Sequence, residues 1–214
     1  MIDDFGISKS TLTILLDIRN PYSYLGIEPA LALAQERTLE INWLPLTSKP
    51  LNAPSLPHAD DDRGLRHRRS RAEAMANEIA VYSDAQGLEI RDYYRDPDPD
   101  LFNQCWLWLR ERDPKLIASF LREAFKAYWA SELDLSRVAA IEATLTAAGA
   151  QHSGLQDWLQ EHGPTRAAAL REVVGDHGRF GMPCYLLEDE ILYGRQHLPL
   201  IRWMLNERKG RAPI

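Results

Sequence analysis

Hydrophobic and polar positions follow two different periods along this chain, and the period changes twice. Near the N-terminus, β-branched and apolar residues fill positions 11–18, as in a buried strand. Apolar residues at helical spacing then occupy positions 21–35, and residues 39–44 alternate between apolar and polar. These patterns predict a strand, a helix and a second strand.

The central part of the chain has mainly the helical period. Four prolines between positions 45 and 57 interrupt regular structure and predict a loop that leaves the sheet. Further along, Gly and Pro stand near several of the expected helix ends. Helices are expected over residues 66–86, 101–112, 114–131, 136–148, 154–160 and 164–177.

The alternating pattern typical of strands returns after residue 180. Residues 184–188 and 191–193 flank Asp189 and Glu190, which predicts a strand hairpin, and residues 198–205 have the pattern of an amphipathic helix. The order along the chain is therefore β-α-β, a helical block, and β-β-α.

That order predicts an α/β protein with a thioredoxin-like fold and a large inserted all-helical domain. Residues 1–50 and 178–214 would form one discontinuous thioredoxin-like domain, because the two ends of the chain would build one sheet. Residues 51–177 would form the inserted helical domain.

Composition and charge exclude several classes of function. The 25 Lys and Arg residues against 31 Asp and Glu residues, a net charge of −6, argue against general binding to nucleic acid or to an anionic membrane surface. Asp3 and Asp4 stand where a signal peptide carries positive charge, and no apolar run is long enough to span a membrane. A cytoplasmic protein without a membrane or nucleic-acid partner is expected.

The cysteines and histidines suggest neither a disulfide nor a metal. Cys105 and Cys184 are the two cysteines, they lie in unrelated contexts, and they form no CxxC pair. The six histidines are scattered without ligand spacing, so we expect no metal site.

One short segment carries candidate chemistry. Asn20 follows the first expected strand and is a good helix N-cap, and Pro21 suits a first helical turn because its missing N–H costs nothing there. Asn20 is thus expected at a helix N-terminus, where free N–H groups and the positive end of the helix dipole favour an anion or a thiolate.

Ordered motifs along nearly the whole chain resemble one known family. The chain is similar to the DsbA-like thioredoxin-fold group, and within it to 2-hydroxychromene-2-carboxylate isomerases and kappa-class glutathione transferases. The residues that carry the resemblance are Asn20-Pro21-Tyr22-Ser23, Asn103, Ala127-Tyr128-Trp129, Gly178 to Pro183, and Gly194-Arg195-Gln196-His197-Leu198.

The resemblance implies a site that holds a thiol belonging to another molecule. Relatives that use glutathione have serine at the position of Asn20, and redox-active relatives have cysteine there. Dithiol exchange is excluded, because it needs an attacking and a resolving thiol and positions 20 and 23 are Asn and Ser. The amide of Asn20 can still donate a hydrogen bond to a thiolate.

The function implied is a glutathione-dependent isomerase or transferase, with glutathione as cofactor and a small electrophilic or aromatic substrate. Asn20 would be the catalytic residue, and a cis peptide bond before Pro183 would let the backbone of Met182 align the cysteinyl part of glutathione. Relatives are often dimers, so the resemblance allows a homodimer. The residues expected to bind substrate or glutathione are Pro21, Tyr22, Ser23, Asn52, Met182, Pro183, Arg195 and Gln196.

Two alternatives remain open at this point. Gln196 stands where glutathione-binding relatives present Asp, and Arg195 beside it could hold a carboxylate instead. The protein could therefore be a non-catalytic binding protein that has lost CxxC chemistry. The other alternative is that it uses the single thiol of Cys184, which directly follows Pro183.

Two groups of side chains can be interpreted either as structural or as functional. The arginine-rich stretch 63–71 is expected mainly to pair with Asp60 to Asp62 at a helix start, although one or two arginines could reach an anionic substrate. Aromatic residues at helical spacing are usually core, although a helical roof could present some of them to a planar substrate. They are Phe102, Trp106, Phe125, Tyr128 and Trp129.

Overall fold

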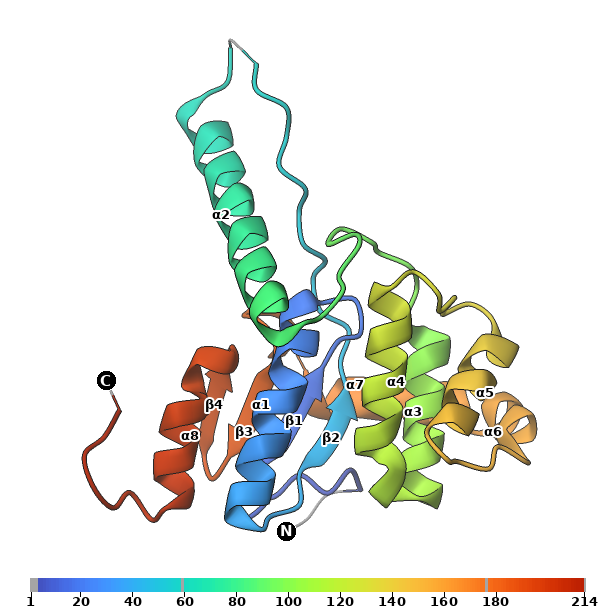
Figure 1. Cartoon of the computed structure of the whole chain (residues 1–214). Coiled ribbons are helices and arrows are strands. Elements are labelled where there is room, and N and C mark those ends of the chain that lie inside the picture. The colour runs from blue at the N-terminus through green and yellow to red at the C-terminus, as the bar shows by residue number, and fades with distance from the viewer. Residues whose placement is uncertain (1–3, 59, 176, 214) are drawn as a thin grey trace.

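The two ends of the chain meet in one sheet. The computed structural model describes residues 4–58, 60–175 and 177–213. In this part of the chain β1 (Thr13–Leu16) pairs in parallel with β2 (Asn42–Pro45) and antiparallel with β3 (Cys184–Leu187), which pairs with β4 (Glu190–Tyr193). The sheet order is β2-β1-β3-β4 (Figure 1). The predicted thioredoxin-like α/β fold is confirmed.

Two helices from opposite ends of the chain pack against each other beside this sheet. They are α1 (Pro21–Arg37), which follows β1, and α8 (Leu198–Leu205), which follows β4 and the short 3-10 helix η3 (Arg195–His197). Figure 1 shows both helices on the same side of the sheet. The start of α1 and the β4–α8 connection are thereby held by the same framework.

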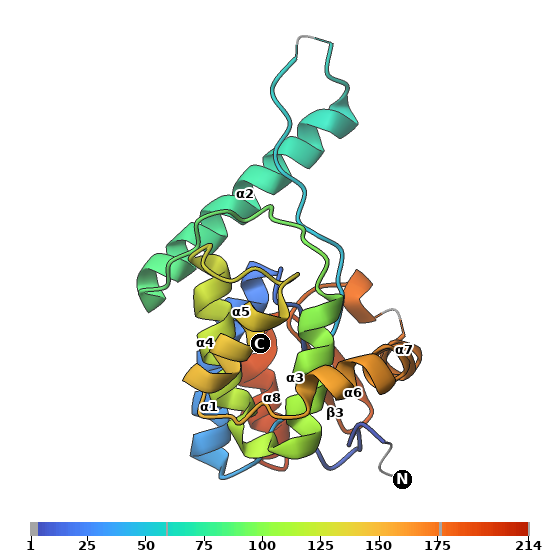
Figure 2. The same cartoon turned by 90° about the vertical axis from the view of Figure 1, so that its right-hand side faces the viewer.

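Five α-helices form a cluster next to the β2 edge of the sheet (Figures 1 and 2). Their order follows the helical pattern of the sequence, with ends shifted by a few residues. A 3-10 turn, η1 (Pro114–Leu116), begins the segment in which one continuous helix was predicted, and η2 (His177–Arg179) follows the last helix. The cluster consists of α3 (Asp100–Arg112), α4 (Ile117–Trp129), α5 (Val138–Ala147), α6 (Leu155–Glu161) and α7 (Gly163–Val174).

The first helix of the insertion, α2 (Arg63–Gln86), packs mainly on α1. Its N-terminal half projects away from the body, and the proline-rich loop runs beside it (Figures 1 and 2). Arg69 ties the loop to the helix by donating to the carbonyl oxygens of Ser55 and Leu56 and by pairing with Asp61. The arginine-rich stretch is thus partly self-paired, and it points away from the start of α1.

The second strand begins later than its alternating pattern predicts. Residues 39–44 were expected, whereas the strand is Asn42–Pro45. The N–H of Leu39 donates to the carbonyl of Ala34, so Leu39 is held in the turn that caps the C-terminus of α1 and does not extend the strand. Pro45 is tolerated because β2 is an edge strand, where a residue need not donate to a neighbour on both sides.

The aromatic side chains at helical spacing are core. Phe102 and Trp106 of α3 and Phe125, Tyr128 and Trp129 of α4 have no exposed surface. The interpretation of these five residues as core is confirmed, and the alternative, that the helical domain presents some of them to a substrate, is wrong for them.

None of the described helices is long and apolar enough to cross a membrane. The described residues also contain no group of three or more His, Cys, Asp and Glu side chains arranged to hold a metal ion.

Candidate functional site

Asn20 is the N-cap of α1, as the sequence predicts. Its side-chain Oδ1 accepts a hydrogen bond from the Tyr22 N–H at 3.0 Å, and its carbonyl oxygen accepts one from the Ser23 N–H at 2.9 Å. Pro21 has no N–H to offer. The first three backbone positions of the helix therefore have no free donor, so the expectation of free N–H groups there is wrong, and only the side chain of Asn20 can donate.

The cap also orients the amide of Asn20. Because Oδ1 is bound to the helix, the amide nitrogen Nδ2 must point the other way, and it makes no hydrogen bond with the described residues. The residue is 8% exposed. Asn20 thus offers one oriented N–H₂ donor at the positive end of a 17-residue helix.

The segment before β3 lies at the same end of the sheet. Leu15 of β1 pairs with Cys184 of β3, so the residues that follow β1 and those that precede β3 are neighbours. The Met182–Pro183 peptide bond is cis. The ring of Pro183 packs against α1 so closely that a Cβ built on Gly26 would lie 2.9 Å from Pro183 Cγ.

The backbone of Met182 has unused hydrogen-bonding capacity. Met182 is 4% exposed, yet neither its N–H nor its C=O forms a hydrogen bond with the residues that the structure describes. The next carbonyl, that of Pro183, accepts from the Gly194 N–H at 2.8 Å. Buried backbone groups without partners are rare in folded proteins, which marks Met182 as a candidate contact for an extended ligand.

The turn that leads into Asn20 contains a buried ion pair that the sequence pattern did not indicate. Asp17 is 1% exposed and Arg19 is 7% exposed, and the Asp17 carboxylate accepts from Nε and Nη2 of Arg19 at 3.1 and 2.9 Å. The same carboxylate accepts from the N–H and hydroxyl of Ser48 at 2.7 and 2.9 Å, and Arg19 also pairs with Asp96. Burial alone would lower the pKa of Arg19, but its hydrogen bonds and ion pairs raise it. This network holds the turn before Asn20 rigidly.

Ser23 belongs to the same support and does not face a ligand. Its side chain is fully buried, and its hydroxyl oxygen accepts a hydrogen bond from the Asp17 N–H at 3.2 Å. Asn52 is exposed in the loop after β2. Ser23 is thus adjacent to Asn20, but its hydroxyl is used inside the protein, whereas Asn52 is not brought to the Asn20–Met182 region by any described contact.

The β4–α8 connection supplies two further predicted residues. Gln196 is exposed, and its side-chain amide donates to the carbonyl of Tyr193 at 2.9 Å, so it folds back over Gly194. Gly194 has φ 95°, and a Cβ there would collide with the Gln196 side chain. The amide of Gln196 is thus used within its own turn.

Arg195 lies close to the first turn of α1. Its Nη2 is 3.7 Å from Oε1 of Glu78 on α2, and Oε2 of Glu78 accepts a hydrogen bond from the Tyr22 hydroxyl at 3.3 Å. Burial and the nearby Glu78 carboxylate raise the pKa of Tyr22, so it stays a neutral donor. Tyr22 and Arg195 are brought together from opposite ends of the chain.

Both cysteine thiols are inert. Cys105 and Cys184 are fully buried and unpaired, and burial raises the pKa of each to about 12. Neither forms a thiolate near neutral pH, and the thiolate is the reactive form. This argues against the interpretation that relies on Cys184 alone.

The thioredoxin-like fold agrees with the protein family that the sequence matches. A family model described as a DSBA-like thioredoxin domain matches residues 11–205. The chain belongs to this family. No match was found among the curated proteins.

Solved structures similar to this DsbA-like protein include enzymes with different chemistry. One is 2-hydroxychromene-2-carboxylate isomerase, with a TM-score of 0.67 and 15% identity over 92% of this chain and 95% of that one. A second is a probable DsbA oxidoreductase from Streptomyces coelicolor, with a TM-score of 0.66 and 17% identity over 95% and 92%. A third is the cytosolic disulfide reductase DsbM from Pseudomonas aeruginosa with GSH, with a TM-score of 0.57 and 18% identity over 92% and 98%. At these identities the likeness shows the fold.

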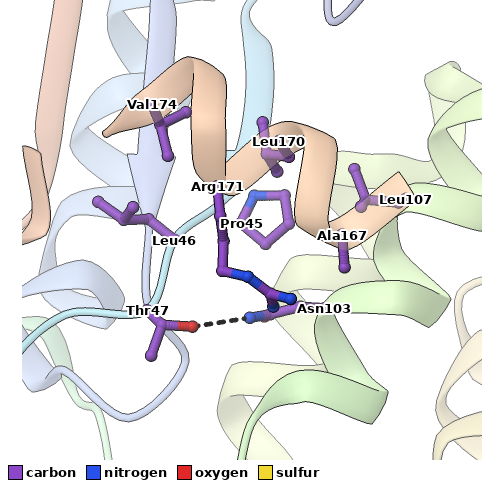
Figure 3. A pocket seen from close by; sticks show the side chains of 9 residues that line it. All are labelled: Pro45, Leu46, Thr47, Asn103, Leu107, Ala167, Leu170, Arg171 and Val174. Atoms are coloured by element: carbon purple, nitrogen blue, oxygen red, sulfur yellow. Dashed lines mark hydrogen bonds between the residues drawn. The ribbon is translucent and has the colours of Figure 1, made fainter. Parts of the chain in front are cut away.

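Two pockets of the DsbA-like chain lie away from Asn20 and Met182. One has a volume of about 20 Å³ and lies between β2, α3 and α7, where Asn103 donates to the Thr47 hydroxyl at 3.3 Å (Figure 3). That volume suits a single water molecule. The other, of about 320 Å³, is lined by Gly6, Asn42 and Arg110 among others. Neither of these two pockets is lined by Asn20 or Met182. The candidate site is defined instead by polar groups that have no partner among the described residues.

Proposed function

We propose that this DsbA-like protein binds glutathione and acts as a glutathione-dependent isomerase or transferase on a small electrophilic or aromatic molecule. The observation that carries the proposal is the pairing of two unused polar groups at one end of the sheet. They are the oriented Nδ2 donor of Asn20 and the backbone of Met182, neither of which has a hydrogen-bond partner in the described part of the chain.

These groups fit the middle of a glutathione molecule. The N–H and C=O of Met182 can pair with an extended peptide, and Asn20 Nδ2 can donate to the cysteinyl sulfur. When bound, glutathione would supply a thiol nucleophile that the chain itself lacks. The ring of Pro183 against Gly26 holds the Met182 backbone at the side of α1, and the Asp17–Arg19 pair holds the turn that carries Asn20.

Electrostatics at Asn20 favour a thiolate over a thiol. A charge-assisted hydrogen bond and the helix dipole together stabilise an anion there by about 1 to 3 kcal/mol. That corresponds to a decrease of about one or two units in the pKa of a bound thiol. A thiol that ordinarily ionises above neutral pH would then be partly ionised at neutral pH.

The structural neighbours support this proposal without deciding it. One is an isomerase and another is a reductase solved with GSH. This chain has no thiol at positions 20 and 23, so the reductive chemistry of thiol exchange does not transfer to it. The expected homodimer and cytoplasmic location stay predictions.

A thermal shift measurement tests glutathione binding. Glutathione at about ten times its Kd stabilises the native state by about 1.4 kcal/mol, which raises the Tm of a domain of this size by about 3 to 5 °C. Turnover is followed with glutathione and a chlorodinitrobenzene as model electrophile. For a binder with a Kd of about 1 mM, ten times the Kd is about 10 mM. No change in Tm at about 10 mM glutathione would rule the proposal out.

A second function, that of a non-catalytic binding protein, has support in two side chains. The Ser23 hydroxyl is occupied by the Asp17 N–H and the Gln196 amide by the Tyr193 carbonyl, which leaves fewer groups to act on a substrate. This alternative predicts that glutathione or a peptide binds but that no model electrophile is turned over.

A further inference from the structure

Four side chains from three elements meet beside the first turn of α1. They are Tyr22 of α1, Glu78 and Tyr82 of α2, and Arg195 of η3, and we call them the Arg195 cluster. Glu78 and Tyr82 are four residues apart on one helix, so they lie on the same face of α2. The guanidinium carbon of Arg195 lies 3.2 Å from the centre of the Tyr82 ring.

Arg195 is held in place but poorly paired. Its side chain is 16% exposed and is stacked on Tyr82. Its Nε is buried and has no hydrogen-bond partner among the described residues, and Nη2 is 3.7 Å from Glu78 Oε1, beyond hydrogen-bond distance. An arginine normally uses such an edge to hold a carboxylate through two parallel hydrogen bonds.

Glu78 does not fill that role because it is shared. Its other oxygen accepts from the Tyr22 hydroxyl at 3.3 Å, and its side chain is half exposed. Glu78 is therefore a weakly bound internal carboxylate, and a free carboxylate that approaches Arg195 can replace it without leaving a charge buried. Tyr22 can keep its hydrogen bond to Glu78 or to water.

The Arg195 cluster is next to both halves of the candidate site. Tyr22 is two residues from Asn20, and Arg195 directly follows Gly194, whose N–H donates to the carbonyl of Pro183 at 2.8 Å. A ligand that lies along Met182 therefore extends toward Arg195.

We propose that Arg195 is a carboxylate subsite of this ligand-binding site and that Glu78 is its internal competitor, which lies beside the subsite and forms a weak ion pair with Arg195 when no ligand is bound. The inference rests on the proposed function, since it concerns the same site. The carboxylate is one of glutathione or one of the acceptor molecule. In either case, ligand binding loosens the contact between α2 and the β4–α8 connection.

Binding titrations with two probes test the subsite and identify the source of the carboxylate. The probes are glutathione, compared with its diethyl ester, and cinnamate, compared with cinnamamide. Arg195→Gln should weaken the carboxylate that uses the subsite at least about tenfold, Arg195→Lys should weaken it less, and Glu78→Gln should strengthen it about three- to tenfold. The ester and amide should respond to none of these changes. Arg202→Gln removes an arginine that pairs with Glu36 on the surface and is the matched control.

The outcomes separate this inference from the proposed function. Cinnamate binding that depends on Arg195, without any binding of glutathione, would support the subsite and reject glutathione as ligand. Glutathione binding that depends on Asn20 but is unchanged by Arg195→Gln, together with cinnamate binding that is equally unchanged or absent, would overturn the subsite and leave the proposed function standing. Failure of both probes to bind overturns both. Circular dichroism and Tm confirm that each variant is folded.

Discussion

Asn20 has two roles that a set of substitutions can separate. Its Oδ1 caps α1 by accepting from the Tyr22 N–H at 3.0 Å, and its Nδ2 is the donor that we assign to a thiolate. Asp keeps the capping oxygen and loses the donor, Ala loses both, and Ser keeps a capping oxygen and a hydroxyl donor.

The expected magnitudes follow from these groups. Asn20→Ala should lower the free energy of unfolding by about 0.5 to 2 kcal/mol through loss of the cap. Asn20→Asp should be near neutral, because the helix dipole favours a negative charge by about 0.3 to 1 kcal/mol and burial of the carboxylate offsets part of that. Both should lose a charge-assisted hydrogen bond of about 1.5 to 3 kcal/mol, which is about a tenfold to hundredfold loss of thiolate affinity.

Urea unfolding measures stability, and calorimetric titration with glutathione at mildly alkaline pH measures affinity. S-methylglutathione is the matched ligand, because it cannot form a thiolate and should bind all variants alike. Asn20→Ser should retain most of the wild-type affinity. If Asn20→Asp binds glutathione as tightly as the wild type does, the donor role of Asn20 is refuted, whereas an Asn20→Ala protein as stable as the wild type would refute the capping role.

Three further predictions follow from the contacts around the site. Gly26→Ala should destabilise the protein by about 1 to 3 kcal/mol and lower its Tm, because the new Cβ would lie 2.9 Å from Pro183 Cγ. Arg19→Met should lower the free energy of unfolding in urea by about 3 to 5 kcal/mol, because it leaves the Asp17 carboxylate buried without its cation. Stability should fall as pH rises above about 8.5, by up to about 1.4 kcal/mol per unit for Cys184, because the thiol ionises in the unfolded chain while its folded pKa is about 12.

Each of these has a direct check. A Gly26→Ala protein as stable as the wild type would mean that the Pro183 loop can move away from α1. For the buried pair, the double variant Asp17→Asn, Arg19→Met should recover part of the lost stability, and no recovery would contradict the charge argument. For the thiol, the fall in stability between pH 9 and 10 should be smaller in Cys184→Ala, and an equal fall would contradict the assignment.

Features that depend on neighbours in the chain could be predicted from the sequence. The cap at Asn20 depends on residues 20–22, and the strand and helix periods depend on spacings of two to four residues, so both are visible in one stretch of chain. The absence of a thiol at positions 20 and 23 excludes dithiol exchange there without any coordinates. The boundary of β2 was predicted less well, because Leu39 forms part of the turn that caps α1.

Contacts between distant segments could not be predicted in this way. The partners of Asp17 and Arg19 include Ser48 and Asp96, and nothing in the local pattern around Asp17 indicates them. The same is true of Glu78 on α2, which meets Arg195 only because α2 packs on α1.

The sequence alone therefore determined the order of elements, the helix cap and the loss of redox thiols. Only the tertiary structure decided that the first-turn N–H groups are occupied, that the donor of Asn20 and the Met182 backbone have no partner among the described residues, and that Ser23 and the aromatic stripes are buried. The physical reason is that capping and periodicity are local, whereas burial and the pairing of polar groups depend on which segments the fold brings together.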